Sequence, residues 1–189
     1  ERYEVGMILN PRLSPAQFLR ATALELGIET PRAQTAALLD QIHVRLLELD
    51  AAGRAAVLIV DEAHLIPRAT TFEEIRLLTN FQLDDRNLIA IVLVGQPELR
   101  ERLRHRAYRA LTQRIGVSFD LGPLAAEDAR AYFAHRLSVA GAVRPLFSEA
   151  AIARLHAAAQ GVPRVLNQLG AVVLIEGRVS RRGGGEGKV

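Results

Sequence analysis

The stretch Val57-Leu58-Ile59-Val60-Asp61-Glu62 gives the clearest indication of the fold. Four successive apolar residues fit a strand that is buried on both faces of a parallel sheet. Two carboxylates follow at the carboxyl end of this strand, where open α/β sheets bind their ligands and where unpaired buried charge is costly. The stretch therefore predicts an α/β fold with a functional acidic turn. The alternative is an ordinary strand that ends in a solvated acidic turn.

Two neighbouring carboxylates at such a place suit the hydrolysis of a nucleoside triphosphate. Asp61 can hold Mg²⁺, and Glu62 can activate a water against a phosphate, as in a Walker B element. The usual partner of these acids is the phosphate-binding loop Gly-x-x-x-x-Gly-Lys-Ser/Thr. The only lysine of the sequence is Lys188, and Arg182 and Val189 stand where that loop needs a glycine and a hydroxyl. We therefore expect the chain to be the downstream portion of a longer ATPase, and to bind ATP weakly or not at all by itself.

Strands and helices are expected to alternate through the first two thirds of the chain. Ser14, Pro15 and Gln17 form the start of a capped helix, and glycines end several of the helices. This alternation predicts right-handed crossovers and a parallel sheet. The expected strands cover 3–9, 57–60, 88–95 and 115–121, and the expected helices cover 14–26, 30–50, a stretch from 71 to 81, and 97–113.

After Gly122-Pro123 the pattern changes to helices alone, expected at 126–140, 149–159 and 163–176. We expect an α/β core over residues 1–122 and a small helical lid over 123–179. Residues 180–189 are rich in glycine and charge, so we expect a disordered tail there.

Composition excludes several classes of protein. With 189 residues and 49% hydrophobic residues the chain can bury a core, but no run of eighteen apolar residues predicts a membrane span. Zero cysteines exclude disulfides and thiolate metal sites, and suit a cytoplasmic protein. The net charge of +3 does not by itself indicate a nucleic-acid partner. Four histidines lack metal-ligand spacing, so Mg²⁺ is the one metal expected: His43, His105, His135 and His156.

Three stretches taken together resemble the AAA+ ATPases of the general secretion pathway A type, a family with relatives encoded beside transposases. They are Val57–His64, Glu73–Asn80 and Val92–Arg100, and Leu111–Ile115 and Gly161–Arg164 fit the same family. The likeness extends from Glu1 to about Arg178. It implies an α/β, parallel-sheet P-loop NTPase (AAA+) core, amino-terminally truncated so that its first strand and Walker A loop are missing, with a small C-terminal three-helix lid.

The resemblance also implies roles for single residues, with ATP and Mg²⁺ as cofactors. Asp61 would lie in the Mg²⁺ shell and Glu62 would orient or deprotonate the attacking water. Gln96 matches the first sensor, although it could be a plain loop amide. Arg114 matches the arginine finger that reaches a neighbouring subunit, although the Arg-rich stretch 100–114 offers ordinary surface arginines or DNA contacts as alternatives. Arg164 matches the second sensor, and an arginine at a helix amino terminus favours an anionic partner.

Three functions remain open from the sequence. The first is an ATP-hydrolysing AAA+ protein, oligomeric when intact, that drives assembly or remodelling in a secretion-type system. The second is an ATP-dependent, DNA-binding regulator of transposition. The third is a non-catalytic remnant that acts as an interaction module. For His64 the sequence favours a satisfied surface histidine over a role in coupling nucleotide state to the next loop.

Overall fold

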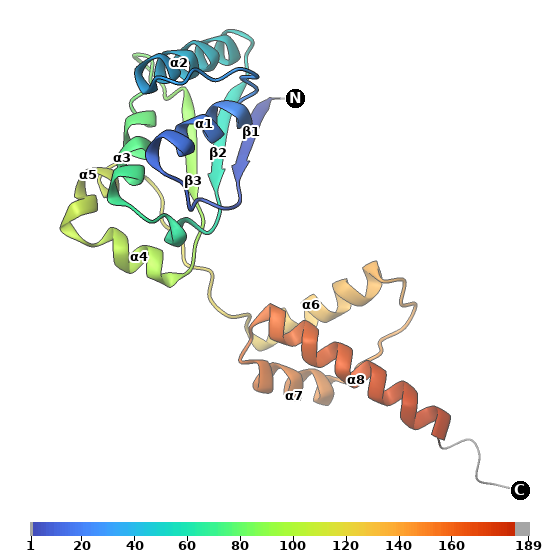
Figure 1. Ribbon diagram of the computed structural model, residues 1–189. Coiled ribbons are helices and arrows are strands. Elements are labelled where there is room, and N and C mark those ends of the chain that lie inside the picture. The colour runs from blue at the N-terminus through green and yellow to red at the C-terminus, as the bar shows by residue number, and fades with distance from the viewer. Residues whose placement is uncertain (1, 184–189) are drawn as a thin grey trace, which may run out of the picture. The chain divides into compact units, whose positions relative to one another are not determined.

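The computed structural model describes residues 2–183, which form two compact units, Glu1–Ser118 and Phe119–Val189 (Figure 1). The sequence places the same change, from alternating strands and helices to helices alone, at residue 122. Each unit has its own cluster of buried apolar side chains. Each is therefore described separately below.

The first unit is built on a parallel sheet, as predicted, but the sheet has three strands rather than the four expected. Its strands are β1 (Tyr3–Ile8), β2 (Ala55–Val60) and β3 (Ile89–Leu93), in the order β1-β2-β3. The register sets Ile8 beside Val60, and Val60 beside Leu93, so the three strands end at one edge. The residues that follow each strand are therefore brought together.

The sheet is covered on one face within this unit, which corrects the expectation of a strand buried on both faces. Ala56, Leu58 and Val60 of β2 are buried, whereas the alternate residues Val57 and Ile59 are only half-buried. On β1 and β3 the outward residues are more open, with Val5 56% and Val92 45% exposed. An unbroken apolar run is compatible with a strand covered on one face and with a strand covered on both. The hydrophobic periodicity of the sequence therefore does not distinguish the two.

Helices α1 (Pro15–Glu25), α2 (Thr35–Ala51) and α3 (Ala69–Leu78) contribute apolar side chains to the same cluster as the inward face of the sheet (Figure 1). Ser14 caps α1 through the predicted capping box. The start of α2 was predicted too early, because Thr30-Pro31 lie in the preceding loop and Gln34 occupies the N-cap position. Similarly, α3 begins before Thr71, whose buried hydroxyl donates to the carbonyl of Leu13 rather than capping the helix.

The single helix expected over 97–113 is instead broken. It consists of α4 (Pro97–Leu103), the 3-10 turn η2 (Arg106–Tyr108) and α5 (Arg109–Thr112). His105 interrupts the run, because its side chain accepts a hydrogen bond from the backbone of Ala107 and caps the second segment. A further 3-10 turn, η1 (Ala63–Leu65), follows β2.

The strand predicted over 115–121 is not formed. Val117, Phe119 and Leu121 are 88%, 81% and 92% exposed, and no strand within the described part of the chain pairs with this segment. The apolar alternation that suggested a strand is present, but a strand also needs a neighbour for its backbone groups. The segment crosses from the first compact unit into the second.

The second unit consists of α6 (Ala126–Val139), α7 (Glu149–Ala159) and α8 (Pro163–Gly183), close to the three helices expected. Phe133, Phe147, Leu155 and Leu166 are among its buried residues. Helix α8 continues past the predicted end at Glu176 and includes the first residues of the predicted tail. The rest of that tail, 184–189, lies outside the described residues. Over the described part of the chain, we find no helix with the length and apolarity that crossing a membrane demands.

Candidate functional site

The acidic turn lies where the three strands end. The backbone N–H of Asp61 donates to the carbonyl of Ile8 over 2.9 Å, which extends the pairing of β1 and β2 by one residue. On the other side, Val94 donates to Val60 over 2.9 Å, and Ala63 donates back to Val94 over 2.8 Å. These bonds hold the turn after β2 against the segments that follow both neighbouring strands.

Glu62 has a backbone conformation that is unusual for its residue type. Its φ of 51° and ψ of 34° lie in the left-handed region, which costs a non-glycine residue about 1–2 kcal/mol. The carboxylate of Asp61 accepts a hydrogen bond from the Glu62 N–H over 2.8 Å and so supports this conformation. Backbone strain of this kind gathers at functional sites, and here it fixes the direction in which the second carboxylate leaves the sheet.

His64 joins Glu62 to the loop after β3. Its Nδ1 accepts the backbone N–H of Gln96 over 3.3 Å, and its Nε2 lies 3.3 Å from Oε2 of Glu62. Because Nδ1 is the acceptor, a neutral ring carries its proton on Nε2, the nitrogen that faces the carboxylate. The side chain is only 11% exposed. The interpretation of His64 as a surface histidine is therefore wrong, and its contacts could not be found from spacing alone.

Arg102 fixes this turn to α4. Its guanidinium donates to the carbonyls of His64 and Ile66, and its Nε donates to the Tyr108 hydroxyl over 2.9 Å. The same group lies over the rings of Phe72 and Tyr108, at 4.9 and 5.4 Å from their centres. One arginine of the Arg-rich stretch is thus part of the packing around the site, a role that the sequence did not reveal.

Of the predicted site residues, Asp61, Glu62 and Gln96 come together at this edge. The guanidinium of Arg114 contacts the carbonyl of Thr79 over 3.5 Å, at the last turn of α3. The ten residues of α3 rise by about 15 Å, so this contact lies about that far from the amino end of α3. Arg164 is exposed in the first turn of α8, in the second unit.

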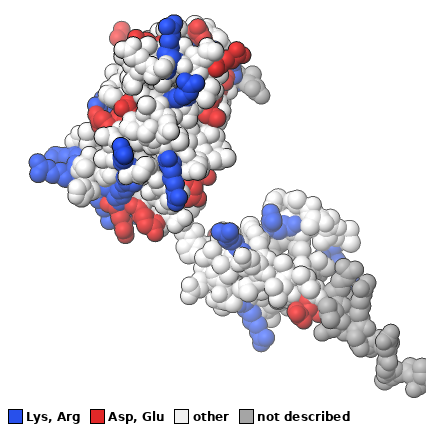
Figure 2. Space-filling view, in the orientation of Figure 1, with Lys and Arg blue, Asp and Glu red and all other residues white. Residues whose placement is uncertain are grey.

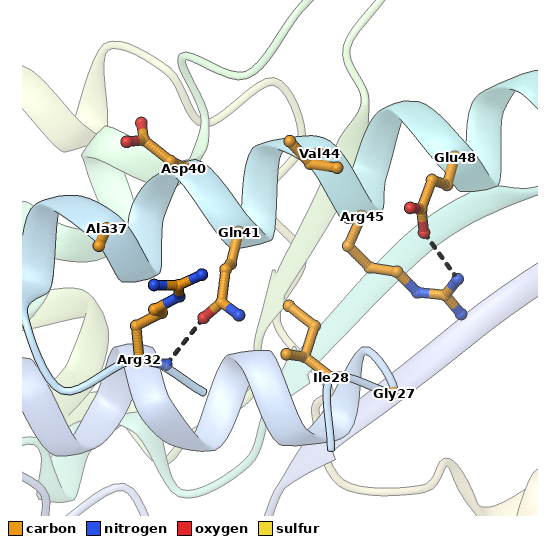
Figure 3. A pocket seen from close by; sticks show the side chains of 9 residues that line it. All are labelled: Gly27, Ile28, Arg32, Ala37, Asp40, Gln41, Val44, Arg45 and Glu48. Atoms are coloured by element: carbon orange, nitrogen blue, oxygen red, sulfur yellow. Dashed lines mark hydrogen bonds and ion pairs between the residues drawn. The ribbon is translucent and has the colours of Figure 1, made fainter. Parts of the chain in front are cut away.

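A pocket of about 520 Å³ lies elsewhere, between α2 and the loop after α1 (Figure 3). Two of its polar side chains, Gln41 and Arg45, hold that loop. Gln41 accepts the Arg32 N–H over 2.7 Å, and Arg45 donates to the Leu26 carbonyl over 2.9 Å and pairs with Glu48. We therefore assign this pocket a structural role and take the edge of the sheet as the candidate site.

The charges of the molecule do not point to a nucleic-acid surface on the face in view. Basic and acidic side chains are interspersed there over the first unit (Figure 2). The described residues also contain no group of three or more potential His, Cys, Asp or Glu metal ligands. A cation at this site would therefore need oxygen ligands from its substrate or from water in addition to Asp61.

Residues 5–103, which include β2, β3, most of β1 and the acidic turn, match the sequence family described as AAA domain. The chain belongs to the AAA domain family. It is also 42% identical over 166 residues to the general secretion pathway protein A of Aeromonas hydrophila. This match covers 87% of the chain and 30% of that protein, so the chain spans less than a third of its relative's length. The family predicted from the sequence, and its likeness to the secretion protein, are both confirmed.

Proposed function

We propose that this AAA domain binds ATP with Mg²⁺ and hydrolyses it when the chain is part of its intact protein. The observation that carries the proposal is the meeting of Asp61, Glu62 and Gln96 at the carboxyl edge of a parallel sheet. Ligands of open α/β sheets bind at such edges. The strained backbone of Glu62 adds support, because an ordinary surface turn gains nothing from it.

The donor groups at the edge fit a magnesium–nucleotide complex. Asp61 would hold the cation, since one of its oxygens is fixed by the Glu62 N–H and Mg²⁺ prefers carboxylate and phosphate oxygens. When bound, the ion would neutralise charge on the phosphates. Glu62, whose side chain is 45% exposed, would orient or deprotonate the attacking water. The Gln96 amide would contact the γ-phosphate or that water.

The two arginines would act on the same nucleotide from other parts of the assembly. Arg114 is exposed at the carboxyl end of α3, which leaves its side chain available for contact with a neighbouring subunit's nucleotide in a homo-oligomer. A finger of this kind raises phosphoryl transfer by about 10³–10⁵. Arg164, at the amino end of α8, would couple the helical unit to the γ-phosphate.

The phosphate-binding loop would come from a segment outside this sequence. Three features support that idea. The outward face of the sheet leaves Tyr3, Val5 and Met7 exposed, β3 has no partner beyond it among residues 2–183, and the alternating segment 115–121 has none either. A further strand and its helix would satisfy all three at once. A parent reading frame without Gly-x-x-x-x-Gly-Lys-Ser/Thr would contradict this.

For the cellular role we propose assembly or remodelling in a secretion-type system, on the cytoplasmic side of the membrane. The support is the relative's name together with 42% identity over most of this chain. Because the chain matches 30% of that protein, the proposal concerns the intact protein.

The direct test is ATP turnover by the intact protein with Mg²⁺ and with excess chelator. Asp61→Asn should lower turnover by about a hundredfold, since it removes the anionic oxygen that would hold the ion. Asp84→Asn is the matched control, because Asp84 is exposed in the loop between α3 and β3. Magnesium-dependent turnover that is equal in both variants would remove Asp61 from the site.

A further inference from the structure

We infer that His64 is a positioning residue that holds the Glu62 carboxylate and joins it to the start of α4. The expected effect of His64 on hydrolysis rests on the proposed function. The connection between Glu62 and α4 rests on the contacts of His64 alone. His64 lies two residues beyond Glu62, and Gln96 lies 32 residues further along the chain at the amino end of α4. A single imidazole ring contacts both.

The hydrogen bond at Nδ1, together with the contact at Nε2, fixes how the ring acts. A backbone amide can only donate, so the contact with the Gln96 N–H requires the lone pair of Nδ1. The proton of the neutral ring is then on Nε2, facing Oε2 of Glu62. One carboxylate oxygen is thereby held by the ring, and the other remains for a water. An ionised carboxylate held by a fixed donor keeps one orientation.

The ring itself has little freedom to move. Its side chain is 11% exposed, and Arg102 holds its carbonyl. Gly95 also contributes, because a Cβ at this position would lie 3.3 Å from both the N and the Nδ1 of His64 and 3.0 Å from Leu99. The loop therefore approaches the ring closely because residue 95 is glycine. A displacement of Glu62 would therefore displace Gln96, and a displacement of α4 would displace Glu62.

His64 makes two contacts, one with the Gln96 N–H (the α4 arm) and one with the Glu62 carboxylate (the carboxylate arm). Amide substitutions at His64 can separate them. Asn in place of His64 can present an acceptor near the position of Nδ1, but it is too short to reach Glu62. Gln can present a donor near the position of Nε2, but leaves the Gln96 N–H without its acceptor. His64→Asn thus keeps the α4 arm, and His64→Gln keeps the carboxylate arm.

In the intact protein, His64→Asn should lower kcat for ATP about tenfold or more with KM little changed, as expected for a misplaced catalytic group. His64→Gln should keep kcat within about threefold of the unsubstituted protein. An unchanged or raised kcat in His64→Asn would overturn the inference. If Glu62→Gln also leaves turnover unchanged, the proposed function has failed, and the exchange measurement below decides the inference by itself.

The second readout needs no nucleotide. Hydrogen exchange at the Gln96 amide, resolved by mass spectrometry of fragment ions, should quicken about tenfold in His64→Gln and stay near its original rate in His64→Asn. Glu62→Ala should also quicken it several-fold, although Glu62 does not contact Gln96, and Glu29→Ala serves as the control. Equal exchange rates in Glu62→Ala and the control would show that no connection exists.

Discussion

The guanidinium of Arg102 lies 4.9 Å from the ring centre of Phe72 while it donates to the carbonyl of His64. One side chain thus ties α4 to α3 and to the turn that carries the acidic pair. Charged hydrogen bonds to otherwise unpaired carbonyls contribute about 1.5–3 kcal/mol, and contact with an aromatic face contributes about 0.5–1 kcal/mol. Arg102 is therefore expected to stabilise the first unit more than the other arginines around it.

Arg102→Met should lower the free energy of unfolding of the first unit by about 2–3 kcal/mol, because it leaves the carbonyls of His64 and Ile66 without their donor. Denaturant unfolding of the whole chain measures the loss. Arg104→Met provides the control, since Arg104 is exposed at the end of the same helix. Equal losses in the two variants would mean that Arg102 is an ordinary surface residue.

Two neighbouring glutamates should affect stability with opposite sign. The hydrogen bonds from Arg76 lower the pKa of Glu73. Burial raises the pKa of Glu74, with a smaller contribution from the charge of Glu73. The Oε2 of Glu74 is buried and has no hydrogen-bond partner among the described residues. Glu73 is thus stabilised as a carboxylate, and Glu74 is stabilised as the neutral acid.

Glu74→Gln should therefore stabilise the protein at pH 7, because a group with a raised folded pKa loses its favourable contribution as pH rises through that pKa. Glu73→Gln should destabilise it at pH 7, because a group with a lowered folded pKa contributes above its unfolded pKa and loses that contribution as pH falls. Both differences should shrink below about pH 4. Unfolding of each variant between pH 3 and 8 measures them, and a shared sign at pH 7 would contradict the assignment.

Gly161 is required in the helical unit for two reasons. Its φ is +72°, and a Cβ there would lie 2.4 Å from the carbonyl oxygen of Leu124. Gly161→Ala should cost the strain of the left-handed backbone, about 1–2 kcal/mol, and a displacement of Leu124 in addition. Gly141→Ala separates the two effects, because Gly141 has a φ of +84° with nothing within 4 Å of an added Cβ.

Hydrogen exchange across α6, α7 and α8 of the whole chain measures both glycine variants. The clash predicts a clearly larger loss of protection for Gly161→Ala than for Gly141→Ala. If the two losses agree, backbone strain accounts for the effect and the approach of Leu124 does not contribute.

Sequence reasoning located the strands and the acidic turn because these depend on local patterns. The run before Asp61 and the capping box at Ser14 both formed as predicted. The errors in the predicted fold concern segments whose structure depends on a neighbouring segment. The open face of the sheet and the unpaired segment 115–121 depend on what lies beside them, which no local pattern records. The break in the Arg-rich helix came from one side-chain cap at His105.

The positions of the site residues could be predicted where they follow from strand ends and strand pairing. Adjacent acids at a strand end predicted where Asp61 and Glu62 would lie, and parallel pairing brought Gln96 beside them. A coupling role for His64 was the less favoured alternative and the role of Arg102 was missed, because their contacts join residues 32 and 38 positions apart. A histidine directly after an acidic pair offered only a weak signal.

The central claim is that Glu62 acts on the water that attacks ATP. The decisive measurement compares ATP binding and turnover of the intact protein with those of Glu62→Gln, with Glu29→Gln as a matched change on the exposed loop after α1. Removing a group that acts only in the transition state should leave nucleotide affinity within about threefold and lower turnover by about a hundredfold or more. Turnover of Glu62→Gln equal to that of Glu29→Gln would contradict the account.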